Sequence, residues 1–177
     1  MLTTEKEQAD FCTEFNISAE KFRNSRLTWV ELEQIAEDFE RKRNEHQNTV
    51  KQYAEVLQKC LAVHSLSYRV KDTKHLIEKI IRKNPKYLET GNALSLENYE
   101  REITDLMGIR LLLLFKEDWL EVHDYLMKMY DNVLFEEPFA YVREGDNTHL
   151  YENKIKIRKE KPYRSVHYVI RADKGLA

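Results

Sequence analysis

Ile109-Arg-Leu-Leu-Leu-Leu-Phe115 is the stretch of sequence that decides the fold. A nearly continuous apolar run of this length predicts a β-strand that is covered on both faces, as strands are in the centre of a sheet. Gly108 separates it from a helical pattern before it, and an amphipathic helix is predicted after it at residues 119–130. These alternating patterns predict an α+β fold, with a mixed β-sheet flanked by helices.

Further strand and helix patterns lie on both sides of this run. Upstream, residues 68–71 alternate like a short strand and lead into a helix that we expect to end before Pro85, because proline disfavours helical backbone in the residue before it. A shorter helix is predicted at residues 97–106. Strands are predicted downstream, with a turn between the first two, at residues 139–143, 153–157 and 166–170.

The first 65 residues have a different character from the rest of the chain. Thr28 and Glu31 have the spacing of a capping box, and the sequence from there to Val63 contains neither Gly nor Pro. Apolar positions stepping by three and four predict a long helix with an apolar stripe. That stripe either packs against the following domain or forms a contact in a homo-oligomer. We therefore divide the chain into a helical region at residues 1–65 and an α+β domain at residues 66–177.

The composition excludes several classes of protein. The 177 residues include 29 basic and 31 acidic side chains, so the net charge of −2 leaves no global positive field and any anion site must be local. Two cysteines are too few for a disulfide framework, and the six histidines lack metal-ligand spacing. Glycine-rich nucleotide-binding, zinc-protease and serine-hydrolase motifs are absent. With no leader pattern and no membrane-spanning run, we expect a cytoplasmic protein without membrane partners.

One candidate site combines residues from three neighbouring segments. Arg110 lies inside the apolar run, where a guanidinium must leave the core or find a partner, and Asp105 precedes that strand at a position where α/β proteins place ligand groups. A salt bridge for Arg110 and a helix-capping or turn-forming role for Asp105 are the structural alternatives. Arg69 and Lys71 share one face of the short strand, and Lys79 follows on the next helix. Together these residues suit a local phosphate site.

A second candidate site lies near the end of the sequence. A basic stretch that includes Arg158 and Lys159 ends beside Tyr163. Strand alternation places Tyr163, Ser165 and His167 on one face, so an aromatic ring, a hydroxyl and an imidazole converge there. Such a set suits a nucleotide, and packing on an edge strand is the alternative.

Three blocks of the sequence resemble, in order and spacing, the synthetase domain of RelA/SpoT proteins and small alarmone synthetases. They are Arg69-Val-Lys followed by Leu76-Ile-Glu-Lys79, Ile103-Thr-Asp-Leu-Met-Gly-Ile-Arg110, and Tyr163-Arg-Ser-Val-His167. The resemblance implies a nucleotidyltransferase-like synthetase fold and a GTP pyrophosphokinase. Such an enzyme transfers pyrophosphate from ATP to the 3′-hydroxyl of GDP or GTP and makes (p)ppGpp, the alarmone of the stringent response, with Mg²⁺ as cofactor.

The resemblance also implies a role for each residue of the first candidate site. Arg69 and Arg110 would sandwich the adenine of ATP, and Lys71 and Lys79 would contact its phosphates. Asp105 would hold Mg²⁺. Asp105, Arg69 and Lys71 form the expected catalytic set. Guanidinium stacking on an aromatic base contributes about 0.5–2 kcal/mol, which makes the adenine sandwich physically reasonable.

In the second candidate site the resemblance implies binding of the acceptor nucleotide. Tyr163 would stack on the acceptor base, with Ser165 and His167 nearby. Lys159 or Arg158 would contact the acceptor phosphates through charge-assisted hydrogen bonds.

Two departures from the family pattern leave alternatives open. Lys161-Pro162 stands before Tyr163 where family members usually have a Gly-containing turn, so the acceptor stays open. The family's catalytic Glu follows this block in a Glu-x-Gln-x-Arg-like motif, and the chain ends at Ala177 without it, so we expect little or no synthetase activity from these residues. One alternative is a pyrophosphokinase toxin of the same family that modifies the 3′-end of tRNA or an adenine nucleotide. Another is a non-catalytic module that binds a nucleotide or a partner.

Overall fold

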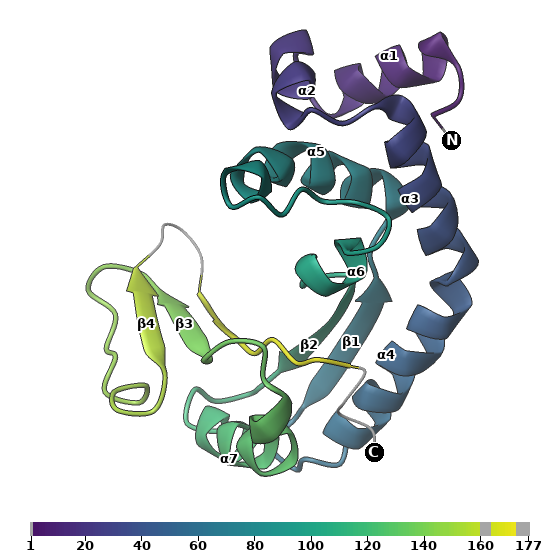
Figure 1. Ribbon diagram of the computed structural model, residues 1–177. Helices are drawn as coiled ribbons and strands as arrows, with labels where there is room; N and C mark the ends of the chain where they lie inside the picture. Colours follow the sequence, from purple (N-terminus) through teal and green to yellow (C-terminus); the bar gives the residue numbers. More distant parts are fainter. Residues whose placement is uncertain (1, 160–163, 173–177) are drawn as a thin grey trace. The chain divides into compact units, whose positions relative to one another are not determined.

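Helices dominate the first part of the chain and short strands the last part in the computed structural model, which describes residues 2–159 and 164–172 (Figure 1). The α+β class and a mixed sheet, predicted from the sequence, are confirmed. The elements in chain order are α1 Glu5–Glu14, α2 Ala19–Ser25, α3 Trp29–Arg41, α4 Arg43–Leu57, β1 Ser65–Val70, α5 Thr73–Glu89, α6 Tyr99–Glu102, β2 Met107–Leu112, α7 Trp119–Tyr130, the 3₁₀ turn η1 Asp131–Val133, β3 Phe139–Val142, β4 Lys156–Lys159 and β5 Ser165–His167.

Helix α3 begins where the sequence predicts a helix. The Thr28 side chain accepts a hydrogen bond from the backbone N–H of Glu31, and the Glu31 side chain accepts one from the backbone N–H of Thr28, which confirms the capping box. A single turn residue, Lys42, separates α3 from α4. The predicted long helix is therefore present as two consecutive helices.

Helix α5 continues through Pro85 to Glu89, so the predicted end before Pro85 is wrong. Tertiary contacts around the proline supply the reason. The buried side chain of Asn84 donates to the carbonyl of Ser25 at 2.7 Å and accepts from the backbone N–H of Leu94 at 2.6 Å. These two buried hydrogen bonds fix the turn that proline weakens by removing one helical hydrogen bond.

The described strands form two small sheets. Strand β1 pairs with β2, and β3 lies between β4, to which it is parallel, and β5, to which it is antiparallel. Side chains of β2 alternate between half-buried and exposed, and Leu112 is 54% exposed. The predicted covering of this strand on both faces is therefore wrong, and Gly108 lies inside the strand, not before it. An apolar run predicts a strand but does not specify how many of its faces are covered.

Other element boundaries differ from the prediction by a few residues. The predicted helix at residues 97–106 is reduced to α6, and the predicted strand at residues 153–157 begins three residues later as β4. The predicted strand at residues 166–170 is divided between β5 and an isolated bridge from Leu134 to Ile170. In the predicted turn at residues 144–147, Gly145 has a φ of +85°, which glycine adopts without strain.

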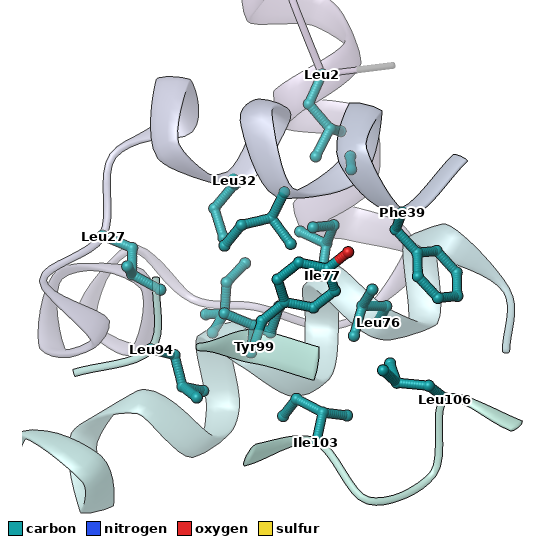
Figure 2. Packing of buried hydrophobic residues seen from close by; sticks show 14 of the residues in the cluster. Leu2, Leu27, Leu32, Phe39, Leu76, Ile77, Leu94, Tyr99, Ile103 and Leu106 are labelled. Carbon is teal, nitrogen blue, oxygen red and sulfur yellow. The ribbon is translucent and has the colours of Figure 1, made fainter. Parts of the chain in front are cut away.

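The chain forms two compact units, and each is built from two separated segments. The first consists of Met1–Lys51 with Tyr68–Ile109, and the second of Gln52–Ser67 with Arg110–Ala177. The first unit packs one face of α5 against α3 and against residues on both sides of α6 (Figure 2). Fully or nearly fully buried members of this cluster include Leu32, Ile35, Phe39, Leu76, Ile77, Ile80 and Tyr99.

The second unit has a smaller cluster beneath one face of its mixed sheet. Trp119 of α7 packs with Ala140 and Val142 of β3 and with Ile155, which precedes β4. None of the helices in the described parts of the chain is both long and apolar enough to cross a membrane.

Candidate functional site

Three residues of the first candidate site meet within the first unit. Lys71 directly follows β1, Lys79 lies on α5, and Asp105 lies in the segment between α6 and β2. The Nζ atom of Lys71 is 3.0 Å from Oδ2 of Asp105, and the Nζ atom of Lys79 is 2.7 Å from Oδ1. A backbone hydrogen bond of 2.8 Å from the N–H of Lys71 to the carbonyl of Leu106 holds the two segments side by side. The carboxylate therefore lies between two ammonium groups.

Electrostatics favour an ionised Asp105. Burial is the largest single influence on its pKa and raises it, but the hydrogen bonds and charges of Lys79 and Lys71 together lower it below the ordinary value. The side chain of Asp105 is 46% exposed, whereas those of Lys71 and Lys79 are 13% and 16% exposed. Two ammonium groups against one carboxylate leave an excess positive charge at this place. Such a site attracts an anion that can reach it from solvent.

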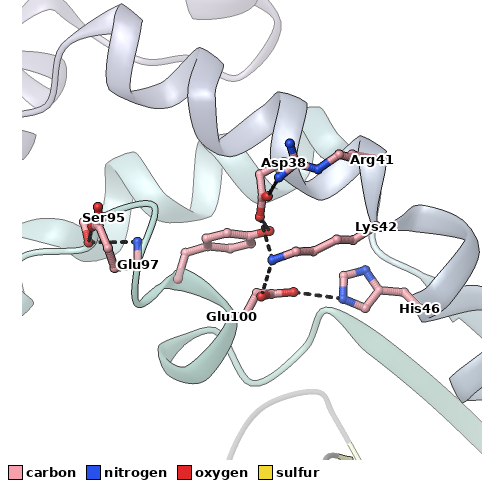
Figure 3. Close-up of polar contacts among 8 residues, drawn as sticks. Asp38, Arg41, Lys42, His46, Ser95, Glu97 and Glu100 are labelled. Atoms are coloured by element: carbon pink, nitrogen blue, oxygen red, sulfur yellow. Dashed lines mark hydrogen bonds and ion pairs between the residues drawn. The ribbon is translucent and has the colours of Figure 1, made fainter.

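A buried polar network fixes the segment that leads to Asp105 (Figure 3). The hydroxyl of Tyr99 donates to Oδ2 of Asp38 at 2.8 Å, and the Nζ atom of Lys42 lies 2.9 Å from the same oxygen. Lys42 also pairs with Glu100 at 2.7 Å. Burial, and after it the hydrogen bond to Asp38, raises the pKa of Tyr99 far above its usual range. The network joins α6 to the α3–α4 junction, and Asp105 follows α6 by three residues.

Sequence reasoning missed this network, although one signal was present. Asp38 lies among the apolar residues of α3, next to Phe39 and three residues after Ile35, and only 7% of it is exposed. A carboxylate on the apolar stripe of a helix requires a polar partner. The sequence does not identify the partner, because Tyr99 is 61 residues away.

Both arginines of the first candidate site are exposed, Arg69 on β1 and Arg110 on β2. Arg69 belongs to the first unit and Arg110 to the second. Neither has an ion pair with another described residue, so the salt bridge considered for Arg110 finds no support in the described part of the chain.

In the second unit, the strand register assigns candidate residues to faces of the sheet. Phe139 is opposite His167, and Tyr141 is opposite both Ser165 and Arg158. Directly opposite residues share a face, so Ser165, His167 and Arg158 lie on one face with these two rings. Lys159 follows Arg158 and lies on the other face. Tyr163 lies outside the described residues.

Phe139 contacts two of these candidate residues. The ring of His167 stacks on it at 5.2 Å between centroids with an interplanar angle of 3°, and the guanidinium carbon of Arg158 is 3.6 Å from its centroid. The Ser165 hydroxyl forms a hydrogen bond of 2.7 Å with Nε2 of His167. Burial, followed by the positive charge of Arg158, lowers the pKa of His167. The imidazole is therefore neutral at neutral pH.

A hollow of about 410 Å³ also lies in the second unit. None of the predicted site residues that the structure describes is among its lining residues, which are His123, Met127, Asp131, Leu134, Phe135, Glu136, Glu137, Pro138 and Lys154. The hollow borders the second candidate site, because the carboxylate of its lining residue Glu136 lies 3.7 Å from the guanidinium of Arg158.

Asp105 is the candidate metal ligand, and its surroundings limit how it can act. The described residues contain no group of three or more His, Cys, Asp or Glu side chains that could hold a metal ion. Proteins commonly bind Mg²⁺ through one or two carboxylates together with substrate phosphates. A single carboxylate at a site that attracts phosphates fits this mode.

Residues 68–177, more than half of the chain, match the family model described as the region found in RelA / SpoT proteins. The chain belongs to the RelA/SpoT family. Comparison with curated proteins and with solved structures gave no match. Membership supports a function of the (p)ppGpp synthetase kind, that is, a pyrophosphokinase with ATP and guanine nucleotides as substrates. The matched region of this RelA/SpoT domain contains Lys71, Lys79 and Asp105.

Proposed function

We propose that this RelA/SpoT domain belongs to an enzyme that transfers a pyrophosphate group from ATP to the 3′-hydroxyl of GDP or GTP. In this proposal Lys71 and Lys79 bind the ATP phosphates, and Asp105 holds Mg²⁺ beside them. The observation that carries the proposal is the Asp105 carboxylate between two ammonium groups, at 3.0 Å and 2.7 Å, inside the region that matches the family. A nucleotidyltransferase-like arrangement of the sheet is part of the same proposal.

Lys71 and Lys79 can exchange one anion for another. In the free protein both ammonium groups bind Asp105. Phosphate oxygens offer the same charge-assisted hydrogen bonds, and a lysine side chain reorients easily about its four-carbon stem. The two lysines therefore turn from the carboxylate to the phosphates when ATP arrives. There they neutralise negative charge and position the phosphate chain, which is most of what catalysis of phosphoryl transfer requires.

Asp105 would then be free to hold Mg²⁺ together with the ATP phosphates. The metal would supply charge neutralisation at the phosphate oxygens. Because the pKa of Asp105 is lowered, the carboxylate is ionised at neutral pH and has the charge that a Mg²⁺ ligand needs.

On the acceptor side, the sheet face of the second unit favours Arg158 over Lys159 as the phosphate contact. Arg158 shares its face with Ser165 and His167. Its guanidinium carbon lies 3.6 Å from the centroid of the Phe139 ring, and one of its nitrogens lies 3.7 Å from the carboxylate of Glu136. A guanidinium that such contacts already position loses less freedom when it binds a phosphate. Arg69 and Arg110 as the adenine sandwich, and Tyr163 as the base-stacking residue, stay predictions.

Calorimetry with a non-hydrolysable ATP analogue tests the donor site. With Mg²⁺ present, Asp105→Ala is expected to weaken binding about tenfold or more, because it removes the metal ligand. Arg110→Ala is expected to weaken binding about 2- to 30-fold, because it removes a stacking partner. Without Mg²⁺, Asp105→Ala is expected to leave binding unchanged or to strengthen it, since the two lysines lose a competing anion. Arg101→Ala is the control, because Arg101 is exposed and pairs with its neighbour Glu102. If neither substitution changes the affinity, the assignment of the site is wrong.

Binding of candidate acceptors in the presence of the same analogue tests the acceptor. GDP and GTP are expected to bind, with Arg158→Gln weakening both and Lys159→Gln serving as the matched control on the opposite face. Binding of ADP or tRNA without binding of GDP or GTP would replace this proposal with the alternative acceptors of the family.

A further inference from the structure

Lys83 continues a line of ammonium groups that begins at the candidate phosphate site. It lies four residues after Lys79 on α5, and Lys86 follows three residues later. Residues spaced by four and three positions share one flank of a helix. Three lysines therefore line one flank of α5, beside the apolar stripe that contains Ile80.

Two contacts show what this flank faces. Lys79 binds Asp105 at 2.7 Å, and two turns further along the hydroxyl of Tyr87 donates to the carbonyl of Glu102 at 3.1 Å. Lys83 lies midway between Lys79 and Tyr87 on the same flank. Its side chain therefore lies along the segment from Glu102 to Asp105, and the negative charge of Asp105 acts on it.

Lys83 has no acidic partner within the described residues, although it is partly buried. The adjacent Arg82, by contrast, is paired with Glu78 at 2.7 Å. Burial lowers the pKa of Lys83 most, and the positive charges of Lys79, Arg82 and Lys86 lower it further. A partly buried cation among like charges is unfavourable in the free protein. The arrangement becomes favourable when an anion with more than one charge binds along this flank.

We infer that Lys83 is a further binding residue of the phosphate site, and that with Lys71 and Lys79 it binds a chain of phosphates along α5. This rests on the proposed ATP site. The carboxylate of Asp105 neutralises only one of the three ammonium charges. The site can therefore bind a ligand that carries several negative charges along its length. ATP carries its charges in that form, whereas AMP does not.

A phosphate series with matched variants tests this inference in the 177-residue chain. Calorimetry compares AMP, ADP and α,β-methylene-ATP on the wild type, Lys83→Gln and Lys74→Gln. For Lys83→Gln, Kd is expected to rise about tenfold for the triphosphate analogue, less for ADP, and not at all for AMP. Lys74→Gln removes the same charge from the same helix and is expected to leave all three affinities unchanged, because Lys74 is 58% exposed and pairs with Glu14.

Lys79→Gln, measured in parallel, separates this inference from the proposed function. If Lys79→Gln weakens binding of the triphosphate analogue and Lys83→Gln does not, the role of Lys83 is refuted and the proposed ATP site stands. If neither substitution weakens binding, both are refuted. An equal loss of affinity for AMP and for the triphosphate analogue would also refute the inference, since it would indicate a general disturbance of the site.

Thermal unfolding of the ligand-free protein distinguishes a binding residue from a structural one. Lys83 is repelled by its neighbours, so Lys83→Gln is expected to leave Tm unchanged or to raise it, as substitution of a binding residue often does. A lower Tm would show that Lys83 stabilises the fold and would overturn the inference.

Discussion

A carboxylate between two ammonium groups stays ionised at lower pH than one in water. At Asp105 the combined effect of Lys79 and Lys71 exceeds the opposing effect of burial, so the pKa of this carboxyl is lowered. The pKa of Asp105 is lower in the folded protein than its unfolded value of about 3.9. The ionised carboxylate therefore stabilises the fold at pH values above about 3.9, and this stabilisation is lost as the pH falls through the folded pKa. The two lysines thus keep a potential metal ligand charged at any physiological pH.

Lys79→Met is expected to raise the pKa of Asp105 toward its ordinary value. Lys79 is the stronger of the two lysine influences on this carboxyl, so its loss leaves the effect of burial less opposed. Carboxyl ¹³C chemical shifts followed through an acid titration measure the change. Lys74→Met is the control and is expected to leave the titration of Asp105 where it is. No movement in Lys79→Met would contradict the contact seen at 2.7 Å.

Tyr99→Phe is expected to destabilise the fold by about 1–3 kcal/mol, because it leaves a buried oxygen of Asp38 with one hydrogen bond fewer. The loss is at the lower end of this range if Lys42 alone satisfies that oxygen. Urea unfolding measures the free energy of unfolding. Tyr68→Phe is the control, since Tyr68 is 47% exposed. Equal stability of Tyr99→Phe and the wild type would show that the hydroxyl contributes nothing to the network.

Candidate residues can be selected from the sequence, whereas the partners that surround them cannot. Asp105, Lys71 and Lys79 were identified as candidates because residue type and position relative to strand and helix patterns limit where phosphate ligands can lie. The pairing of Tyr99 with Asp38 depends on how α6 packs against α3, and neither local pattern specifies that packing.

Element ends that are marked by a local sequence signal are predicted most accurately. The capping box at Thr28 predicts the start of α3 because both of its hydrogen bonds lie within four residues. The end of α5 was mispredicted because the contacts that carry the helix past Pro85 come from Ser25 and Leu94. Local propensity is a weak guide where tertiary contacts compensate for it.

Asn84→Ala is expected to destabilise the protein by about 2–4 kcal/mol, since it leaves a buried carbonyl and a buried N–H without partners. The last turn of α5, after Pro85, is expected to lose protection first. Urea unfolding gives the first quantity, and hydrogen exchange of residues 86–89 gives the second. Asn92→Ala is the control, because Asn92 is exposed. Normal exchange in Asn84→Ala would show that the turn does not depend on these hydrogen bonds.

The division of the whole molecule into two units could not be predicted from the sequence. Each unit combines segments that are far apart in the chain. The chain changes unit between Lys51 and Gln52 of α4, between Ser67 and Tyr68 of β1, and between Ile109 and Arg110 of β2. A pattern within one strand does not show that its two ends belong to different cores. The register of β3 with β4 and β5, which places Arg158 on the same face as Ser165 and His167, is likewise a property of pairing between distant segments.

If donor and acceptor phosphates bind to different units, each nucleotide protects a different part of the chain from hydrogen exchange. An ATP analogue is expected to slow exchange around residues 71–79 and 105–106, and GDP around residues 156–159 and 165–167. Adenosine is the control for the donor and is expected to leave residues 71–79 unchanged, because it lacks the phosphates that Lys71 and Lys79 would bind. Protection of residues 156–159 by the ATP analogue alone would contradict the assignment, since it would place the donor phosphates on the mixed sheet of the second unit.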